Sequence, residues 1–302
     1  GRNKNKIDKL ASGEKEMVLS SGWAGTQLLN SDDYRAYVGG TTGLIYGFVN
    51  DGFYTVDDFK PFDSKSRTWT LKDGVVNSSP LSGDPRPGNA NFKKLTPVDE
   101  NSANPYTLTD DDRTVIGNTT PKFSGGFGLN ATFKGFDVSA FFNFMYDFDV
   151  FNANKVMMTT WASNNYNNFS MDISSAKRWR NFDDMGNEIR YSPEILAEFN
   201  KNATMWNPTS IGRPIAMSYA VEDGSFLRLN TATIGYTLPL VWTNKVGLSK
   251  VRFYVSGYNL FTITGYSGYD PEVDIATGLT PNIDNNRYPR SRTYTFGAQL
   301  TF

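Results

Sequence analysis

Apolar and polar residues alternate without a break along the final segment of the chain, residues 292–302. Successive side chains of a strand point to opposite faces of a sheet, so this alternation predicts a strand with one apolar face and one small, polar face. A tilted strand of about ten residues is long enough to cross a bilayer, with lipid on its apolar side and water on the other. The apolar positions are Tyr294, Phe296, Ala298, Leu300 and Phe302.

Five further segments carry enough of this pattern to be predicted as strands. Lys134 and Gly135 separate two of them and form a two-residue turn of the hairpin type. In another segment, Arg228 and Asn230 disturb the alternation, which predicts a β-bulge there. The segment within residues 34–56 is the least regular. The predicted strands are 34–56, 123–133, 136–146, 225–238 and 250–259.

The connections between these strands alternate between long and short. The turn at 134–135 and the connection 239–249 are short, and the others are long. This alternation places every long connection at one end of the sheet, as in an outer-membrane β-barrel with long extracellular loops and short periplasmic turns. A helix is predicted over 192–199, with Pro193 at its first helical position. The long connections are 57–120, 147–224 and 261–291.

We therefore predict an all-β protein, a transmembrane antiparallel β-barrel with long extracellular loops. Six strands are too few to enclose a wet lumen, and an unpaired strand edge cannot face lipid. The chain is accordingly expected to be the C-terminal part of a larger barrel. A first strand that it does not contain is expected to pair with its last strand.

The 302-residue chain has no histidine and no cysteine. Without them it lacks the commonest general base, the commonest metal ligand and any disulfide, so we predict that it is not an enzyme and has no cofactor or metal. Asp110, Asp111 and Asp112 could together bind a cation, but a solvated acidic turn is the simpler interpretation. The net charge of −1 offers no basic field, so no nucleic-acid partner is expected.

Aromatic residues in the long connections are candidate contacts for a substrate or for a lid above it. Flat aromatic faces suit sugar rings, and Asn or Asp side chains nearby can bind hydroxyl groups. The alternative is that the same rings hold long loops together, because aromatic side chains also dominate loop cores. The candidates are Trp161, Tyr166, Trp179, Trp206, Tyr266, Tyr269 and Asp270.

The strand pattern also assigns side chains to the two faces of the sheet. Those on the polar face are expected to face the lumen and to contact a plug or a passing substrate; they are Arg228, Arg252, Tyr254 and Tyr258. The aromatic residues of the last strand are expected to meet lipid, and the terminal one resembles the signal read by the barrel assembly machinery. This predicted assembly signal comprises Tyr294, Phe296 and Phe302.

Four stretches in order along the chain resemble the C-terminal third of the SusC/RagA-type TonB-dependent transporters. The resemblance covers roughly residues 40–302. One departure concerns an acidic turn that resembles a calcium loop in many family members, because residues 93–99 lack the required spacing of acidic residues. No metal is expected there. The four stretches are Asp112–Phe123, Glu222–Pro239, Gly257–Glu272 and Tyr288–Gly297.

The resemblance implies a plugged barrel of about 22 strands, of which this chain would hold about the last six. Residues 1–33 would continue from a missing upstream barrel, and 34–302 would form the C-terminal barrel portion. It implies import of oligosaccharides or oligopeptides across the outer membrane of a Gram-negative bacterium. The implied partners are a SusD-like surface lipoprotein, the upstream barrel and plug, the lipid bilayer, and TonB-ExbB-ExbD through the missing N-terminal region. A non-transporting surface binding protein or adhesin with glycan-binding loops is the alternative.

Overall fold

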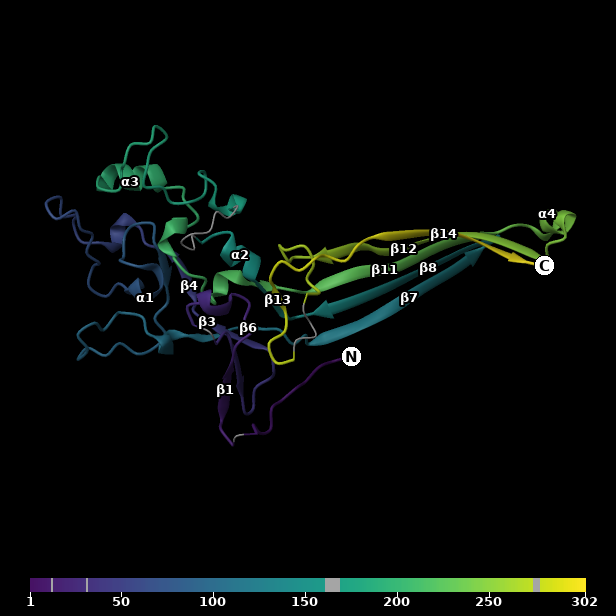
Figure 1. Cartoon of the computed structure of the whole chain (residues 1–302), viewed down its shortest axis with the longest axis horizontal. Helices are drawn as coiled ribbons and strands as arrows, with labels where there is room; N and C mark the ends of the chain where they lie inside the picture. The colour runs from purple at the N-terminus through teal and green to yellow at the C-terminus, as the bar shows by residue number, and fades with distance from the viewer. Residues whose placement is uncertain (12, 31, 161–168, 274–277) are drawn as a thin grey trace.

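A computed structural model describes residues 1–302 except 12, 31, 161–168 and 274–277. The molecule has two parts, a long sheet at one end and a body of folded loops at the other (Figure 1). We call the second part the loop body; it comprises the described residues within 1–122, 147–224 and 265–292. Within the described ranges, no helix has the length and apolar character needed to cross a membrane.

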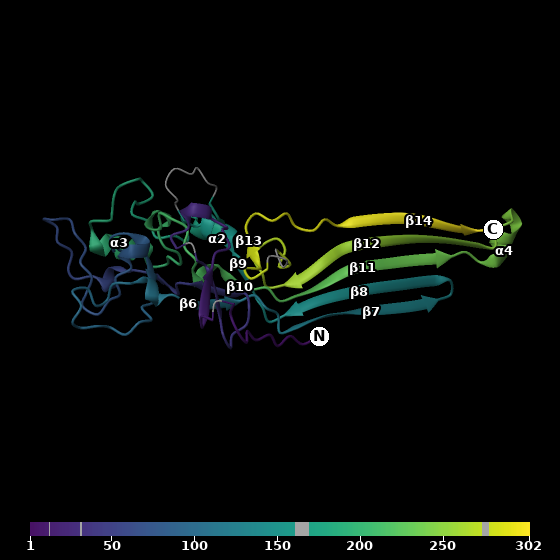
Figure 2. The ribbon, with the colours of Figure 1, turned by 60° about the horizontal axis from the view of Figure 1, so that its bottom comes forward.

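The long sheet contains five antiparallel strands in the order β14-β12-β11-β8-β7. Figure 2 shows them side by side. Each of the five lies in a segment that alternates in sequence, because one face of the sheet is apolar and the other polar. The strands are β7 Phe123–Phe133, β8 Phe136–Tyr146, β11 Phe226–Thr237, β12 Lys250–Thr264 and β14 Thr293–Thr301.

The expectation of a sixth strand in this sheet from residues 34–56 is wrong. This segment forms β2 Tyr34–Tyr37, β3 Leu44–Gly47 and β4 Asn50–Phe53, which lie in two smaller sheets of the loop body. All four residues of β3 are buried. A strand covered on both faces needs no alternation, which explains the irregular pattern and the misassignment.

The strand register aligns the apolar positions of the five strands on one face. One row runs across the whole sheet: Ala131 pairs with Val138, Val138 with Ile234, Ile234 with Val255, and Val255 with Phe296. Directly opposite residues project from the same side of a sheet. The apolar residues therefore form one continuous apolar face, and the intervening residues form a polar face.

Two local predictions in the long sheet are confirmed. Lys134 and Gly135 both have positive φ, 45° and 87°, as a two-residue hairpin turn of type I′ requires. The pairing of β11 with β8 leaves out Asn230 between Leu229 and Thr231, which places a bulge there, whereas at the same point of the pairing with β12 the extra residue lies in β12. The bulge keeps the alternation of β11 in phase with its neighbours on either side of it.

The two ends of the long sheet differ as the connection lengths predicted. The turn 134–135, the connection containing α4 (Leu240–Thr243) and the C-terminus lie at one end, and the loop body lies at the other (Figure 1). The described parts of the long connections form short strands, helices and a buried core. The helix α3, Pro193–Asn200, confirms the helix predicted over 192–199.

The loop body is built from small sheets around a shared core. β1 pairs with β2, so one sheet joins residues on both sides of position 33. The core includes Ile45, Phe151 and Trp206. Its remaining strands are β1 Glu16–Leu19, β5 Ala90–Phe92, β6 Thr114–Asn118, β9 Asp149–Asn152, β10 Val221–Asp223 and β13 Ile283–Asp284. Its α-helices besides α3 are α1 Ser79–Ser82 and α2 Ala153–Met157. The 3-10 helices of the chain are η1 Gly25–Gln27, η2 Val56–Asp58, η3 Asp110–Asp112, η4 Met171–Ile173, η5 Pro208–Ser210, η6 Ser218–Ala220 and η7 Asn244–Val246.

Candidate functional site

The polar face of the long sheet carries an ion pair that spans three strands. Arg252 of β12 donates to Asp137 of β8, through Nε at 2.8 Å and Nη2 at 2.5 Å. The pair passes over Gly235 of the intervening strand β11, where a Cβ would collide with both partners. Tyr254 lies in the same way over Gly297 of β14. Large side chains thus lie flat along this face where glycine leaves room.

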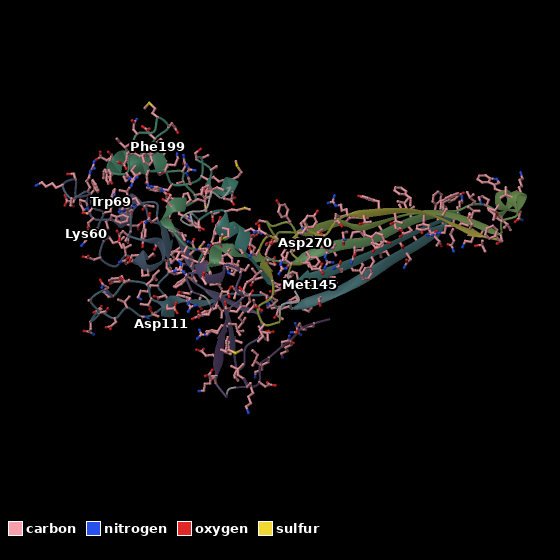
Figure 3. All side chains as sticks on the ribbon, in the orientation of Figure 1. Lys60, Trp69, Asp111, Met145, Phe199 and Asp270 are labelled. Carbon is pink, nitrogen blue, oxygen red and sulfur yellow. The ribbon has the colours of Figure 1, made fainter. Side chains whose placement is uncertain are left out.

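A second ion network joins the polar face to the loop body; we call Arg228, Asp270, Glu272 and Arg290 the junction network. Arg228, only 2% exposed, donates to Asp270 at 2.5 Å and lies 3.6 Å from Glu272. Glu272 also pairs with Arg290 at 2.9 Å. Figure 3 shows Asp270 where the long sheet meets the loop body. Burial is the largest single influence on the pKa of Asp270 and raises it, but the hydrogen bond and charge of Arg228 together with backbone hydrogen bonds outweigh burial, so the pKa is lowered.

The same loop is held to the loop body by Tyr266 and Ser267. The Tyr266 hydroxyl donates to Asp284 at 2.7 Å, and burial together with this carboxylate raises the pKa of Tyr266. Ser267 donates to Glu222 through its backbone N–H at 2.9 Å and its hydroxyl at 2.8 Å. Tyr266 is therefore engaged inside the protein, whereas Tyr269 is 86% exposed.

The structure separates the tryptophan candidates from one another. Trp206 is 2% exposed, lies 4.8 Å from the ring of Tyr219 and donates to the carbonyl of Thr159 at 3.3 Å. Its burial favours the loop-core interpretation. Trp179 is also buried, yet it lines a large cavity. The remaining two candidates lie outside the described residues; they are Trp161 and Tyr166.

This cavity, which we call the arginine cavity, occupies about 1170 Å³ in the loop body. Figure 3 shows one of its lining residues, Trp69, in the part of the loop body that lies away from the long sheet. Two acidic residues, Asp84 and Asp183, contribute to the lining. Its cationic residues are Arg67, Arg86, Arg178, Arg180, Arg190 and Arg213. Its aromatic residues are Trp69, Phe169, Trp179, Phe182 and Tyr191.

Several of these guanidinium groups are held by rings or by fixed polar partners. Arg67 lies 4.6 Å and Arg190 5.7 Å from the centre of the Tyr191 ring. Arg180 pairs with Asp184 at 2.7 Å. Arg213 donates to the backbone carbonyls of residues 26, 27 and 28. Such contacts fix the planes of the guanidinium groups around the cavity.

Sequence reasoning missed the arginine cavity because its cationic residues are scattered from position 67 to position 213. No spacing rule connects residues that only loop folding brings together. A local signal does exist: Arg178 and Arg180 flank Trp179, and Arg190 precedes Tyr191. Arginine next to an aromatic residue, repeated in one loop, suggests stacked cations.

The acidic turn considered as a cation site holds protein donors instead. The Asp112 carboxylate accepts from the backbone N–H groups of Leu95, Thr96 and Thr109 at 2.8–2.9 Å, and from the Thr96 hydroxyl at 2.6 Å. Burial alone raises the pKa of Asp112, but these hydrogen bonds bring it down to about 2. Among the residues described, no group of three or more acidic side chains is arranged to hold a metal.

Known proteins resemble this chain in both sequence and fold. TonB-dependent receptor P3 of Formosa agariphila is 30% identical over 307 residues, which cover 100% of the chain and 26% of that receptor. TonB-dependent receptor SusC of Bacteroides thetaiotaomicron is 31% identical over 164 residues, or 50% of the chain and 15% of SusC. The RagAB peptide transporter superposes with a TM-score of 0.63 over 98% of the chain, at 20% identity. The chain belongs to the SusC/RagA family of TonB-dependent receptors.

The SusC/RagA-family chain corresponds to only part of its relatives. It spans 26% of receptor P3 and 25% of the matched chain of the RagAB transporter. The RagAB peptide importer in its open-open state shares the fold as well, with a TM-score of 0.57 at 20% identity. No family model matches the sequence. The relatives named here are receptors and transporters, in agreement with the expectation of a non-enzymatic protein.

Proposed function

We propose that this chain is the C-terminal barrel portion of a TonB-dependent importer of oligosaccharides or oligopeptides in the outer membrane of a Gram-negative bacterium. The observation that carries the proposal is the continuous apolar face across all five strands of the long sheet. Residues along it remain well exposed, such as Phe296 and Ile234. Exposed apolar area of this extent needs a partner, and lipid fits a band that covers every strand.

In this proposal the two faces and the two ends of the long sheet have separate roles. The polar face lines the lumen against a plug, where Tyr254 and Tyr258 lie within reach of it. The edge strands β7 and β14 pair with further strands of the same barrel, and residues 1–33 lead in from that upstream part. The loop body faces outward beneath a SusD-like lipoprotein, and TonB-ExbB-ExbD acts through the upstream region.

Transport is tested by uptake in a strain that carries the complete receptor. Deletion of the receptor gene should abolish growth on at least one member of a panel of oligosaccharides and oligopeptides offered as sole carbon source. Disruption of TonB should give the same defect while the receptor remains in the outer membrane. If the deletion strain shows no growth defect, or if the defect is independent of TonB, a non-transporting surface binding protein is the correct reading.

The membrane orientation is tested independently with single cysteines, since the chain contains none of its own. A cysteine at Val138 on the apolar face should be shielded from a charged maleimide in intact membranes. A cysteine at the neighbouring Ser139 on the polar face should react once the lumen is accessible. Equal labelling at both positions would contradict the assignment of the apolar face to lipid.

A further inference from the structure

We infer that the arginine cavity binds a negatively charged oligosaccharide, one whose sugar units carry carboxylate or sulfate groups. The inference rests on the proposed import function and specifies the substrate class that this site would take. The residues that line the arginine cavity belong neither to the long sheet nor to the junction network. Charge, geometry and shape of the cavity each support the inference.

The lining of the arginine cavity carries more positive than negative charge. The lining contains six arginines against two aspartates, Asp84 and Asp183. The Asp183 carboxylate is occupied locally, because it accepts from the side chain of Asn187 at 2.8 Å and from two backbone N–H groups. Among the described residues, no carboxylate lies within ion-pair distance of Arg67, Arg86 or Arg178. Arg180 and Arg190, in contrast, pair with Asp184 and Glu188 outside the lining. Arg67, Arg86 and Arg178, without a carboxylate partner, leave the cavity with an excess of positive charge that attracts anions.

Two guanidinium groups of the cavity lie over aromatic rings. Arg67 and Arg190 both lie over the ring of Tyr191, and Arg190 also lies 5.6 Å from the centre of the Phe182 ring. Stacked guanidinium groups lose less conformational freedom on binding than free lysine side chains would. Their planar forks match the paired oxygens of a carboxylate or sulfate group. Arg190 is also paired with Glu188 at 2.5 Å, so Arg67 is the stacked guanidinium group that presents preorganised donors to an acidic substituent.

The lining of the arginine cavity suits a bound sugar better than a peptide. One common mode of peptide recognition adds the peptide as a further strand to a sheet edge, and no lining residue of the cavity belongs to one of the strands described above. The lining instead offers flat rings, including Trp69, Tyr191 and the half-exposed Phe182. The volume of about 1170 Å³ exceeds that of typical small-ligand pockets, about 300–1000 Å³, and has room for several sugar units.

Binding should be measured by titration calorimetry on the complete receptor in detergent. The probes are hexagalacturonate and a sulfated oligosaccharide of the same length, with maltohexaose as the neutral match and hexaglutamate as the acidic peptide. Both acidic oligosaccharides should bind, and more weakly at high salt. Arg67→Gln and Arg86→Gln should each weaken that binding about tenfold, because each removes one charge-assisted contact. Lys65→Gln removes an exposed charge from the same loop without touching the cavity and should change nothing.

The outcomes separate this inference from the import function. Tight binding of maltohexaose, unaffected by the arginine variants, overturns the anionic class, and so does failure of both acidic oligosaccharides to bind. Tighter binding of hexaglutamate than of the acidic oligosaccharides would assign the cavity to acidic peptides and overturn the inference of an oligosaccharide ligand. Melting of the variants at the wild-type temperature excludes misfolding, and Arg67→Lys should recover part of the affinity. TonB-dependent growth on any nutrient stays intact in all these cases if the proposed import function is right.

Discussion

At the scale of single residues, the junction network shows how a charged side chain is kept in a buried position. Arg228 projects from β11 into a site that is almost closed to solvent, and two carboxylates of the loop that follows β12 surround its guanidinium group. The Nε of Arg228 has no hydrogen-bond partner within the described chain. Buried ion pairs recover their desolvation cost only when every donor is satisfied. The pair of Arg228 and Asp270 therefore serves to position the loop more than to stabilise the fold. It fixes the loop of Asp270 against the sheet.

Arg228→Met tests this role. The variant leaves Asp270 buried without its cation and Glu272 with Arg290 alone, so it should lower the free energy of unfolding by about 3 to 5 kcal/mol. The measurement is thermal or denaturant unfolding of the complete receptor in detergent. Arg290→Met provides the control, because Arg290 pairs with the same Glu272 from a half-exposed position and should cost at most about 1 kcal/mol. Equal effects of the two variants would show that burial of Arg228 is unimportant.

Asp112 gives a prediction about pH. Its pKa falls from 3.8 to about 2 in the folded protein, so the hydrogen-bonded carboxylate stabilises the fold at pH values above 3.8. This contribution, about 2 kcal/mol, should be lost as the pH falls from 4 toward 2. Hydrogen exchange of the Leu95 and Thr96 amides at pH 5 and pH 2.5 measures it.

Two variants provide the comparison for Asp112. Asp112→Asn should already expose the amides of Leu95 and Thr96 to exchange at pH 5 and should remove most of the pH dependence. Asp111→Asn changes an exposed neighbour with no such hydrogen bonds and should behave like the wild type. Protection that is unchanged in Asp112→Asn would show that the carboxylate does not hold this turn.

At the scale of elements, each strand of the long sheet has two environments, and neighbouring positions should therefore respond differently to the same substitution. Ala140 of β8 lies on the apolar face between Leu129 and Ala232. Ser139 is its neighbour and lies on the polar face between Asn130 and Thr233. A register slip of one residue would exchange the two environments, so the pair tests both the register and the lipid contact.

Ala140→Arg should reduce the stability of the protein in lipid by about 2 to 4 kcal/mol, because it places a charge in the hydrocarbon layer. Ser139→Arg should cost much less, since that side chain can reach the aqueous lumen. Unfolding by denaturant in lipid vesicles measures both variants under identical conditions. Comparable destabilisation by the two arginines would mean that lipid does not cover this face.

At the scale of the whole molecule, the long sheet and the loop body lie at opposite ends and present different surfaces. The sheet presents matched apolar and polar faces, and the loop body collects every long connection at one end, where it encloses the arginine cavity (Figure 1). The C-terminus lies at the opposite end, beside the short connections. The proposed substrate site and the predicted assembly signal at Phe302 therefore lie at opposite ends, where each could change independently of the other.

This separation predicts that the terminal aromatic residue affects assembly and not binding. Deletion of Phe302 should reduce the amount of folded receptor in the outer membrane severalfold, measured by heat-modifiable mobility in gels. Receptor that does fold should bind its ligand with unchanged affinity. Tyr288→Ala is the matched control, because Tyr288 in the loop body is 91% exposed and Phe302 is 90% exposed. If the two variants assemble equally well, Phe302 carries no assembly signal.

The sequence alone determined the features that repeat at short range. Alternation with a period of two predicted the five strands of the long sheet, their apolar face, the turn at Lys134 and the bulge beside Arg228, because each depends on neighbours along the chain or across one strand pair. Connection lengths predicted which end carries the loops. Four motif stretches indicated the family, which the similar proteins confirm.

Only the tertiary structure decided how the loops fold and which side chains they bring together. Residues 34–56 were misassigned because β3 is buried on both faces, so its pattern does not alternate. Trp206 and Trp179 read alike in sequence and both lie in buried hydrophobic clusters, yet only Trp179 also lines the arginine cavity. The partners of Arg228 lie in the loop that follows β12, far along the chain from Arg228 itself. The six arginines of the cavity come from two other connections, 57–120 and 147–224. Long-range loop packing depends on shape and burial, which leave no periodic trace in the sequence.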